Sequence, residues 1–346
     1  MTTSRRILVI GGTRFIGAAV VRHLHAARHT VAVFHRGETP GELPASVEHI
    51  HGDARAALTP ALRDALRSFA PDTVLHNIVL GEPDVIATHE LFDGIARRLI
   101  MTSSMDVYRV FGRLHGTEPG PRLPLPIDED GELREVLYPY RDKFPDPSHR
   151  MHHYDKIPAE RAALGSERMP GTVLRLPMVI GPHDWQRRLL GLAKPMADGR
   201  EAIVWSDEYA AWQSTYGFVE NVAAAMALAA TDDRAIGRTY NVCDVACSMR
   251  ELADHARAAT GWSGRIVTAP GERLPEALRF EIADPHPLVV SAARIGRELG
   301  FVAPVPFAEG VARTVEWELA NVPDPLPPGV ADYAAEDEAL KALGEL

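Results

Sequence analysis

Short apolar runs alternate with amphipathic stretches of helical length along the first part of the chain. Because these runs are brief and rich in β-branched residues, they predict buried strands at Ile7–Ile10, Thr30–His35, Val47–His51, Asp72–Ile78 and Leu99–Ser104. The stretches between them predict helices from the end of the glycine segment at Gly17 to about Ala27, over Leu58–Phe69 and over Leu91–Arg97. Strands separated by helices are typical of βαβ units. We therefore predict an α/β fold with a doubly wound parallel sheet.

The alternation of strands and helices stops between residues 112 and 150, where seven prolines exclude a regular helix and predict a long loop region. Regular structure is expected to resume with a helix around His152–Ser166 and a strand at Thr172–Leu176. Further helices are predicted at Asp184–Gly199, Glu220–Ala230 and Met249–Thr260, and a Pro-rich segment, Val322–Val330, leads to an acidic helical tail, Tyr333–Leu346.

Composition narrows the class of protein. The chain has 346 residues and a formal charge of −10, which argues against a dedicated nucleic-acid binder. Its two cysteines form no ligand cluster, so we expect a reducing, cytoplasmic setting without structural disulfides. No apolar run has the length of a membrane span. The 15 histidines show no metal-binding spacing, and we expect no metal site.

Three glycines mark the junction between the first predicted strand and helix, in the segment Gly11-Gly12-Thr13-Arg14-Phe15-Ile16-Gly17. Glycines at such a junction allow a tight turn, close approach of a pyrophosphate and close packing of the helix on the strand. The alternative is a tight turn without a ligand. The strand–turn–helix context favours a Rossmann-type dinucleotide site that involves all seven residues.

The end of the second predicted strand bears on the cofactor. An NAD site typically has an acidic residue there, whereas this chain has His35, Arg36 and Gly37, with no acid before Glu38. Arg36, alone or together with Arg14, could pair with a 2′-phosphate, or it could be a solvated loop residue. We predict NADP as the cofactor, with NAD as the alternative.

Taken in order, several segments resemble the extended and atypical short-chain dehydrogenase/reductase superfamily, and specifically its NAD-dependent epimerase/dehydratase branch. The glycine turn, His35-Arg36-Gly37 and Gly52-Asp53 are followed by Thr102-Ser103-Ser104-Met105-Asp106-Val107-Tyr108. Later segments that resemble the family are Arg175–Pro182, Gly217–Ala223 and Gly237–Val242. The resemblance implies that Asp53 lies beside the adenine.

The resemblance also implies a division of the chain. We expect residues 1–180 to form the dinucleotide-binding domain, with the chain re-entering it at about residues 215–245. A smaller substrate lobe would comprise residues 181–214 and 246–322, and residues 323–346 would form the Pro-rich segment and tail.

In this superfamily the chemistry rests on Ser or Thr, Tyr and Lys, with Tyr and Lys four residues apart on one helix face. This chain departs from that pattern: Lys156 is preceded at four residues by His152, and Tyr154 is only two residues away. Either His152 takes the proton-transfer position, or an irregular helix start brings Tyr154 to it, or the redox chemistry is altered or lost. We give Tyr154 slight preference, because phenol chemistry needs no new mechanism.

Two further residues complete the predicted site. Ser104 is the candidate hydroxyl at the end of its strand, or alternatively a helix N-cap. His76 closes the fourth predicted strand and should approach the nicotinamide, unless it is a satisfied buried histidine.

We accordingly expect an NAD(P)-dependent oxidoreductase, epimerase or dehydratase that acts on a carbinol or carbonyl of a small polar substrate, such as a sugar or nucleotide sugar. The alternative is a regulatory or RNA-associated protein of the atypical branch that binds a dinucleotide without turnover. The expected partner is a small-molecule substrate, without nucleic acid or membrane, and the chain is expected to be a monomer or homodimer.

Overall fold

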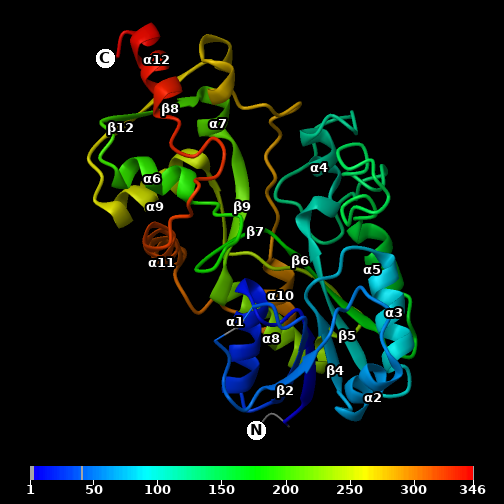
Figure 1. The fold of residues 1–346 in the computed structure, drawn as a ribbon. Coiled ribbons are helices and arrows are strands. Elements are labelled where there is room, and N and C mark those ends of the chain that lie inside the picture. Colours follow the sequence, from blue (N-terminus) through cyan, green and yellow to red (C-terminus); the bar gives the residue numbers. More distant parts are fainter. Residues whose placement is uncertain (1–3, 40–41, 346) are drawn as a thin grey trace.

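A parallel sheet of seven strands forms the base of the molecule in the computed structural model, which describes residues 4–39 and 42–345 (Figure 1). In spatial order the strands are β10 (Thr239–Asn241), β6 (Gly171–Leu176), β5 (Arg98–Ser104), β4 (Thr73–His76), β1 (Arg6–Ile10), β2 (Thr30–His35) and β3 (Glu48–His51). Every neighbouring pair runs parallel. The order reverses at β1, so the carboxyl ends of β1 and β4 flank the crevice where α/β folds bind ligands. The predicted doubly wound sheet is confirmed.

Helices cover both faces of this sheet because its central strands are apolar on both sides. One face packs against α1 (Phe15–Ala26), α8 (Val219–Thr231) and α10 (Ala293–Leu299). The other face packs against α2 (Pro60–Ser68), α3 (Glu82–Phe92) and α5 (Lys156–Leu164). Helix α10 contributes Ile295 and Leu299 to the core of the sheet, although these residues fall in the range expected for the substrate lobe.

The remaining elements build a second lobe above the carboxyl ends of the strands (Figure 1). Its strands are β7 (Met178–Ile180), β8 (Ala202–Ser206), β9 (Gln213–Phe218), β11 (Val245–Ser248) and β12 (Arg265–Ala269). Its helices are α6 (Leu190–Ala197), α7 (Asp207–Ala211), α9 (Met249–Thr260), α11 (Phe307–Ala320) and α12 (Tyr333–Leu343). A short helix, α4 (Arg109–Leu114), precedes the proline-rich stretch.

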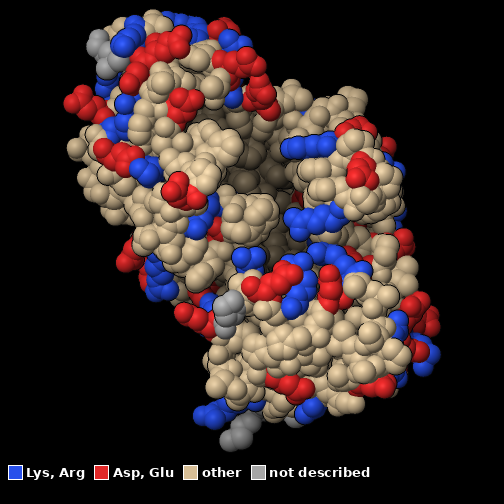
Figure 2. Space-filling model, viewed as in Figure 1, with Lys and Arg blue, Asp and Glu red and all other residues tan. Residues whose placement is uncertain are grey.

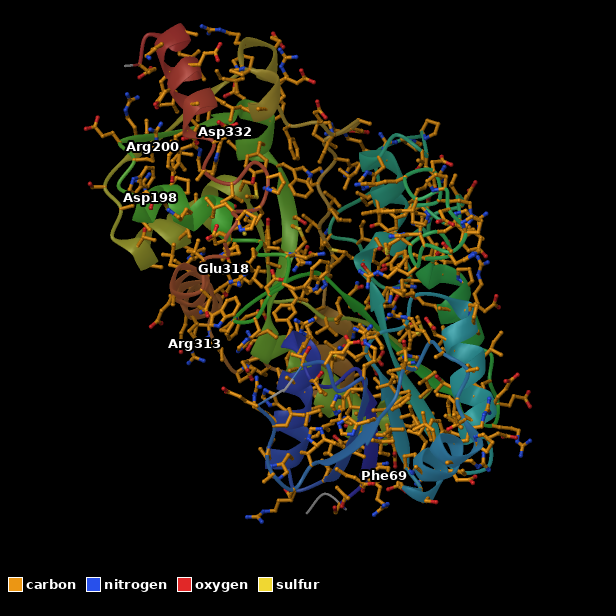
Figure 3. The ribbon with its side chains drawn as sticks, viewed as in Figure 1. Phe69, Asp198, Arg200, Arg313, Glu318 and Asp332 are labelled. Atoms are coloured by element: carbon orange, nitrogen blue, oxygen red, sulfur yellow. The ribbon has the colours of Figure 1, made fainter. Side chains whose placement is uncertain are left out.

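Polar contacts hold the C-terminal helices against this lobe, in the region where Asp198, Arg200 and Glu318 are labelled in Figure 3. Arg200 pairs with Asp337 of α12 at 2.5 Å, and the hydroxyl of Tyr333 donates to Asp198. Glu318 of α11 is fully buried and accepts a hydrogen bond from the backbone N–H of Leu189. The tail helix is therefore part of the packed lobe, while Leu346 of the predicted tail lies outside the described residues.

The space between the two parts is a hollow on the surface (Figure 2). Lys and Arg side chains gather along one of its edges, where the proline-rich stretch faces the second lobe (Figure 2). Across the described residues no helix is both long enough and apolar enough to span a membrane.

Two predicted helices are wrongly placed. The predicted helix Leu91–Arg97 is wrong because α3 runs over Glu82–Phe92; the Asp84 carboxylate accepts the Leu80 N–H at its start, and Gly94 has a φ of 72° just after its end. The predicted helix Asp184–Gly199 begins only at Leu190. The Asp184 carboxylate accepts the N–H groups of Gln186 and Arg188 and holds the preceding residues in a turn.

Candidate functional site

The glycine turn joins β1 to α1 with the conformation that the sequence predicts. Gly11 has a φ of 83°, in the left-handed region that favours glycine. A Cβ atom at Gly17 would overlap the carbonyl oxygen of Gly11. A Cβ atom at Gly12 would instead lie 2.9 Å from a methyl carbon of Val33. Gly11 and Gly17 thus serve the turn itself, and Gly12 serves the packing of α1 on the sheet.

The N-terminus of α1 points its free N–H groups toward this turn. Arg14 is the N-cap residue and makes no side-chain cap, and no acidic residue lies in the first helical turn. Such an end carries partial positive charge and suits an anionic group. Thr13, Phe15 and Ile16 are half-buried around it. The residues present therefore fit the pyrophosphate of a dinucleotide.

The residues expected near the adenosine end lie on the adjoining strand ends. Arg36 follows β2, is exposed and pairs with Glu38 at 2.8 Å. Asp53 follows β3 and its carboxylate accepts the backbone N–H of Arg55 at 2.9 Å. Both side chains are accessible from solvent, so a ligand can reach them without a rearrangement of the core.

His76 ends β4 and is buried. Its Nδ1 lies 3.1 Å from the hydroxyl of Thr88. Burial, with a smaller contribution from the cation of Lys156, lowers the pKa of His76 to about 4. A neutral, hydrogen-bonded imidazole of this kind matches the alternative that the sequence left open, which is a satisfied buried histidine. The imidazole also lies close enough to Lys156 for the lysine charge to affect its pKa.

At the end of β5 the chain turns into a short 3-10 helix over Met105–Val107. The hydroxyl of Ser104 accepts the backbone N–H of Asp106 at 3.2 Å and caps this helix. Asp106 itself is buried, and one of its carboxylate oxygens has no hydrogen-bond partner among the described residues. Burial raises the pKa of Asp106 above that of an ordinary aspartate.

Tyr154 lies against this carboxyl group. Its hydroxyl donates to Asp106 Oδ2 at 2.7 Å. Burial, reinforced by the negative charge of Asp106, raises the pKa of Tyr154 well above that of a free phenol. The Lys156 ammonium lies 5.5 Å from the centre of the Tyr154 ring. Tyr154, Asp106 and Lys156 therefore form one cluster at the carboxyl end of β5.

Lys156 is the first residue of α5 and is buried. Its ammonium donates to the carbonyl oxygens of Val79 and, at 3.1 Å, Thr102. Burial lowers the pKa of Lys156 to about 8, although the carboxylate of Asp106 opposes the shift. The lysine is thereby held at the ends of β4 and β5, above the crevice.

The helix around His152–Ser166 starts four residues later than predicted. Asp155 caps α5: its carboxylate accepts the backbone N–H of Ile157 at 2.9 Å. A regular helix through His152 would have brought its ring to the face of Lys156, but His152 lies in a turn and its Nδ1 contacts the carbonyl of Phe144 at 2.8 Å. The irregular start is the geometry that brings Tyr154 near Lys156.

Buried ion pairs fix this cluster. Asp155 pairs with Arg134 at 3.2 Å, and Arg134 also donates to the carbonyl of Asp106 at 2.6 Å. Glu160, one turn along α5 from Lys156, pairs with Arg175 of β6 at 2.7 Å. Removal of one partner from such a buried pair is costly, so the start of α5 and the end of β5 are held in a fixed relation.

Asp106 is the residue that sequence reasoning missed. It belongs to the segment Thr102–Tyr108 that carries the resemblance, in which Ser104 is the only residue predicted to belong to the site. An aspartate next to a predicted strand end was a usable signal. Its burial against Tyr154 depends on the fold of the proline-rich stretch, which no local pattern reveals.

The sequence of this chain is similar to the sequences of known proteins. The profile of the NAD dependent epimerase/dehydratase family matches residues 7–92 and 131–243. The dTDP-glucose 4,6-dehydratase of Neisseria gonorrhoeae is 24% identical over 364 residues, which cover 92% of this chain and 96% of the relative. The 2'-dehydrokanamycin reductase of Streptomyces kanamyceticus is 27% identical and covers 79% of this chain and 72% of the relative.

Solved structures share the fold. UDP-glucose 4-epimerase of Thermotoga maritima, solved with UDP-glucose, has a TM-score of 0.66 at 18% identity and covers 92% of this chain and 99% of its own. The Bordetella bronchiseptica enzyme WbmG, solved with NAD and UDP, has a TM-score of 0.66 at 19% identity and covers 92% and 96%. The family match confirms the resemblance that the ordered motifs predict.

Proposed function

Because the chain belongs to the NAD dependent epimerase/dehydratase family, we propose that it converts a nucleotide sugar in a redox-neutral reaction that begins with oxidation of a sugar carbinol. The observation that carries this proposal is the cluster of Tyr154, Asp106 and Lys156 at the carboxyl end of β5, on the same edge of the sheet as the glycine turn after β1. Dinucleotide bound at this turn would accept and return a hydride at the substrate carbon.

The side chains of the cluster supply the proton chemistry. The Tyr154 oxygen takes the carbinol proton as the hydride leaves, and Asp106, already hydrogen-bonded to that hydroxyl, accepts the proton in turn. Lys156 favours the negative charge that develops on the phenol, since its ammonium lies beside the ring. Because burial raises the pKa of Asp106, its carboxyl group can also hold a proton and return it later.

A second acid–base group favours dehydration over simple reduction. Elimination of water from an oxidised sugar needs one group that removes a carbon-bound proton and one that protonates the leaving hydroxyl. Asp106 holds the carbinol proton after the oxidation and can give it, through Tyr154, to the leaving hydroxyl. The Asp106 carboxylate is then free to take up the carbon-bound proton by the same route. The names of several relatives, dTDP-glucose 4,6-dehydratases, agree with this assignment.

The first test supplies the purified chain with NAD or NADP and a panel of dTDP- and UDP-hexoses. We expect the mass of one substrate to fall by one water, without net formation of reduced cofactor. An isomer of unchanged mass would indicate epimerisation, and stoichiometric reduced cofactor would indicate a dehydrogenase. Cofactor binding without any change in the panel would contradict the proposal and favour a non-redox binding protein.

We propose NADP as the preferred cofactor, on the strength of Arg36 at the end of β2. Arg36→Ala should weaken NADP binding by about tenfold or more and leave NAD binding nearly unchanged, because only the 2′-phosphate loses a charge-assisted contact. Calorimetric titration of both cofactors measures the difference.

The matched control for this experiment is Glu38→Gln. Glu38 forms an ion pair with Arg36 at 2.8 Å, so removal of the Glu38 charge frees Arg36 and should leave NADP binding as tight or tighter. Equal losses of NAD and NADP affinity in Arg36→Ala would contradict a role for Arg36 in reading the 2′-phosphate.

A further inference from the structure

Three histidines gather on one face of the sheet at its β3 edge. His35 ends β2, and His49 and His51 lie on β3. Alternate residues of a strand share a face, and the register pairs His35 with His51 and Val33 with His49, so both histidines of β3 flank the ring of His35. Nitrogen atoms of all three rings lie within 4.8 Å of one another.

The rings interact closely. Nε2 of His35 lies 2.8 Å from Nδ1 of His49, and the centres of the His35 and His51 rings are 4.7 Å apart. The ring nitrogens are therefore close enough for one cation to contact all three after movements of the rings.

We propose that His35, His49 and His51 bind a divalent transition-metal ion, with Zn²⁺ as the representative, through three imidazole nitrogens. Imidazole is a preferred ligand for zinc, copper, nickel and cobalt, and three protein ligands with one open position are an ordinary zinc arrangement. His49 and His51 are exposed and His35 is half-buried, so an ion from solvent can reach the site.

Small movements complete the coordination. Tetrahedral ligands at about 2.0–2.1 Å from zinc lie about 3.3 Å apart, so the rings of His35 and His49, whose nitrogens are 2.8 Å apart, must separate by roughly half an ångström. Nitrogen pairs that lie further apart, at up to 4.8 Å, must approach by up to about 1.5 Å. The backbone N–H of Gly37 donates to Nδ1 of His35, which places the proton of the neutral ring on Nε2. On metal binding this proton moves to Nδ1 and the Gly37 contact opens. Residues Arg36–Glu38 are exposed, so this segment has room to shift.

This site could not be recognised from the spacing of histidines along the sequence. The spacing of His49 and His51, with only Ile50 between them, is a strand pattern rather than a helical metal motif, and the third ligand comes from the neighbouring strand. The inference does not depend on the proposed enzymatic reaction, because it concerns the free chain and the metal alone.

The test is calorimetric titration of Zn²⁺ into the full-length, metal-free chain after removal of any affinity tag. We expect one ion per chain, with affinity at least about tenfold weaker in His49→Asn and in His51→Asn, since each variant removes one ligand. His25→Asn is the matched control: His25 is a half-buried histidine of α1 whose ring contacts Ser46 at 2.7 Å, and its loss should not affect binding.

Circular dichroism checks that all three variants keep the fold, as expected for positions outside the buried core. The proposal is overturned if the wild-type chain binds no Zn²⁺ with one-to-one stoichiometry, or if His49→Asn and His51→Asn bind it as tightly as the wild type does. Two independent ligand variants keep the result interpretable if one of them is poorly folded.

Discussion

Replacement of Tyr154 by phenylalanine is expected to lower turnover by about 10²–10⁴-fold while cofactor affinity is preserved. The substitution keeps the ring and removes only the hydroxyl that donates to Asp106 at 2.7 Å. The reason for a loss of this size is that the hydroxyl is the group positioned to exchange a proton with a substrate carbinol. Turnover is measured by mass spectrometry on the nucleotide sugar that the panel identifies.

His152→Gln is the discriminating variant. His152 contacts the carbonyl of Phe144 in the turn before α5, so we expect its replacement to leave turnover within a few-fold of the wild type. If His152→Gln causes the large loss and Tyr154→Phe does not, histidine is the proton donor. Full activity in both variants would remove both residues from the mechanism.

Asp106→Asn is expected to reduce turnover by about 10²–10³-fold, because the amide can still accept a hydrogen bond from Tyr154 but can neither take up nor release a proton. The same variant should not be less stable at neutral pH. Burial raises the pKa of Asp106 in the folded chain, so the folded state loses stability as the pH rises from the ordinary aspartate pKa through the raised value. Asparagine carries no charge and avoids this loss.

Turnover and the free energy of unfolding at neutral pH are therefore measured together. Asp142→Asn, an exposed aspartate of the same proline-rich stretch, is the matched control and should affect neither quantity. Wild-type turnover in Asp106→Asn would exclude Asp106 from proton transfer. A large loss of stability would instead identify a structural carboxylate.

The sheet was predictable because its strands are short apolar runs separated by helices, and this local pattern can be recognised in the sequence alone. Met249–Thr260 matches a predicted helix from end to end, since a capping box at Ser248 and a left-handed Gly261 mark its two ends. The predicted helix Leu91–Arg97 is wrong because α3 ends at Phe92, where Asp93 and Gly94 mark its end.

The site was only partly predictable, for a different physical reason. Residues 11–17 and Lys156 stand next to recognisable elements, and their positions follow from those elements. Whether Tyr154 or His152 approaches Lys156 depends on the residue where α5 begins, and Asp155 fixes that start through bonds to Arg134 and Ile157. The histidine cluster likewise depends on the pairing of β2 with β3, which is a contact between strands.

The late position of β10 in the chain has a consequence for biosynthesis. The sheet of seven strands takes its last strand from Thr239–Asn241, and the core on one of its faces needs α8 and the even later residues Ile295 and Leu299. A nascent chain that ends near residue 180 therefore exposes an unpaired edge at β6 and an apolar face that is covered by α1 but not yet by α8 and α10. Contacts between such distant segments carry a high loop-closure cost and slow folding. The N-terminal domain cannot complete its sheet and core until most of the second lobe has been synthesised. During this interval the chain is most exposed to aggregation and has most need of chaperones.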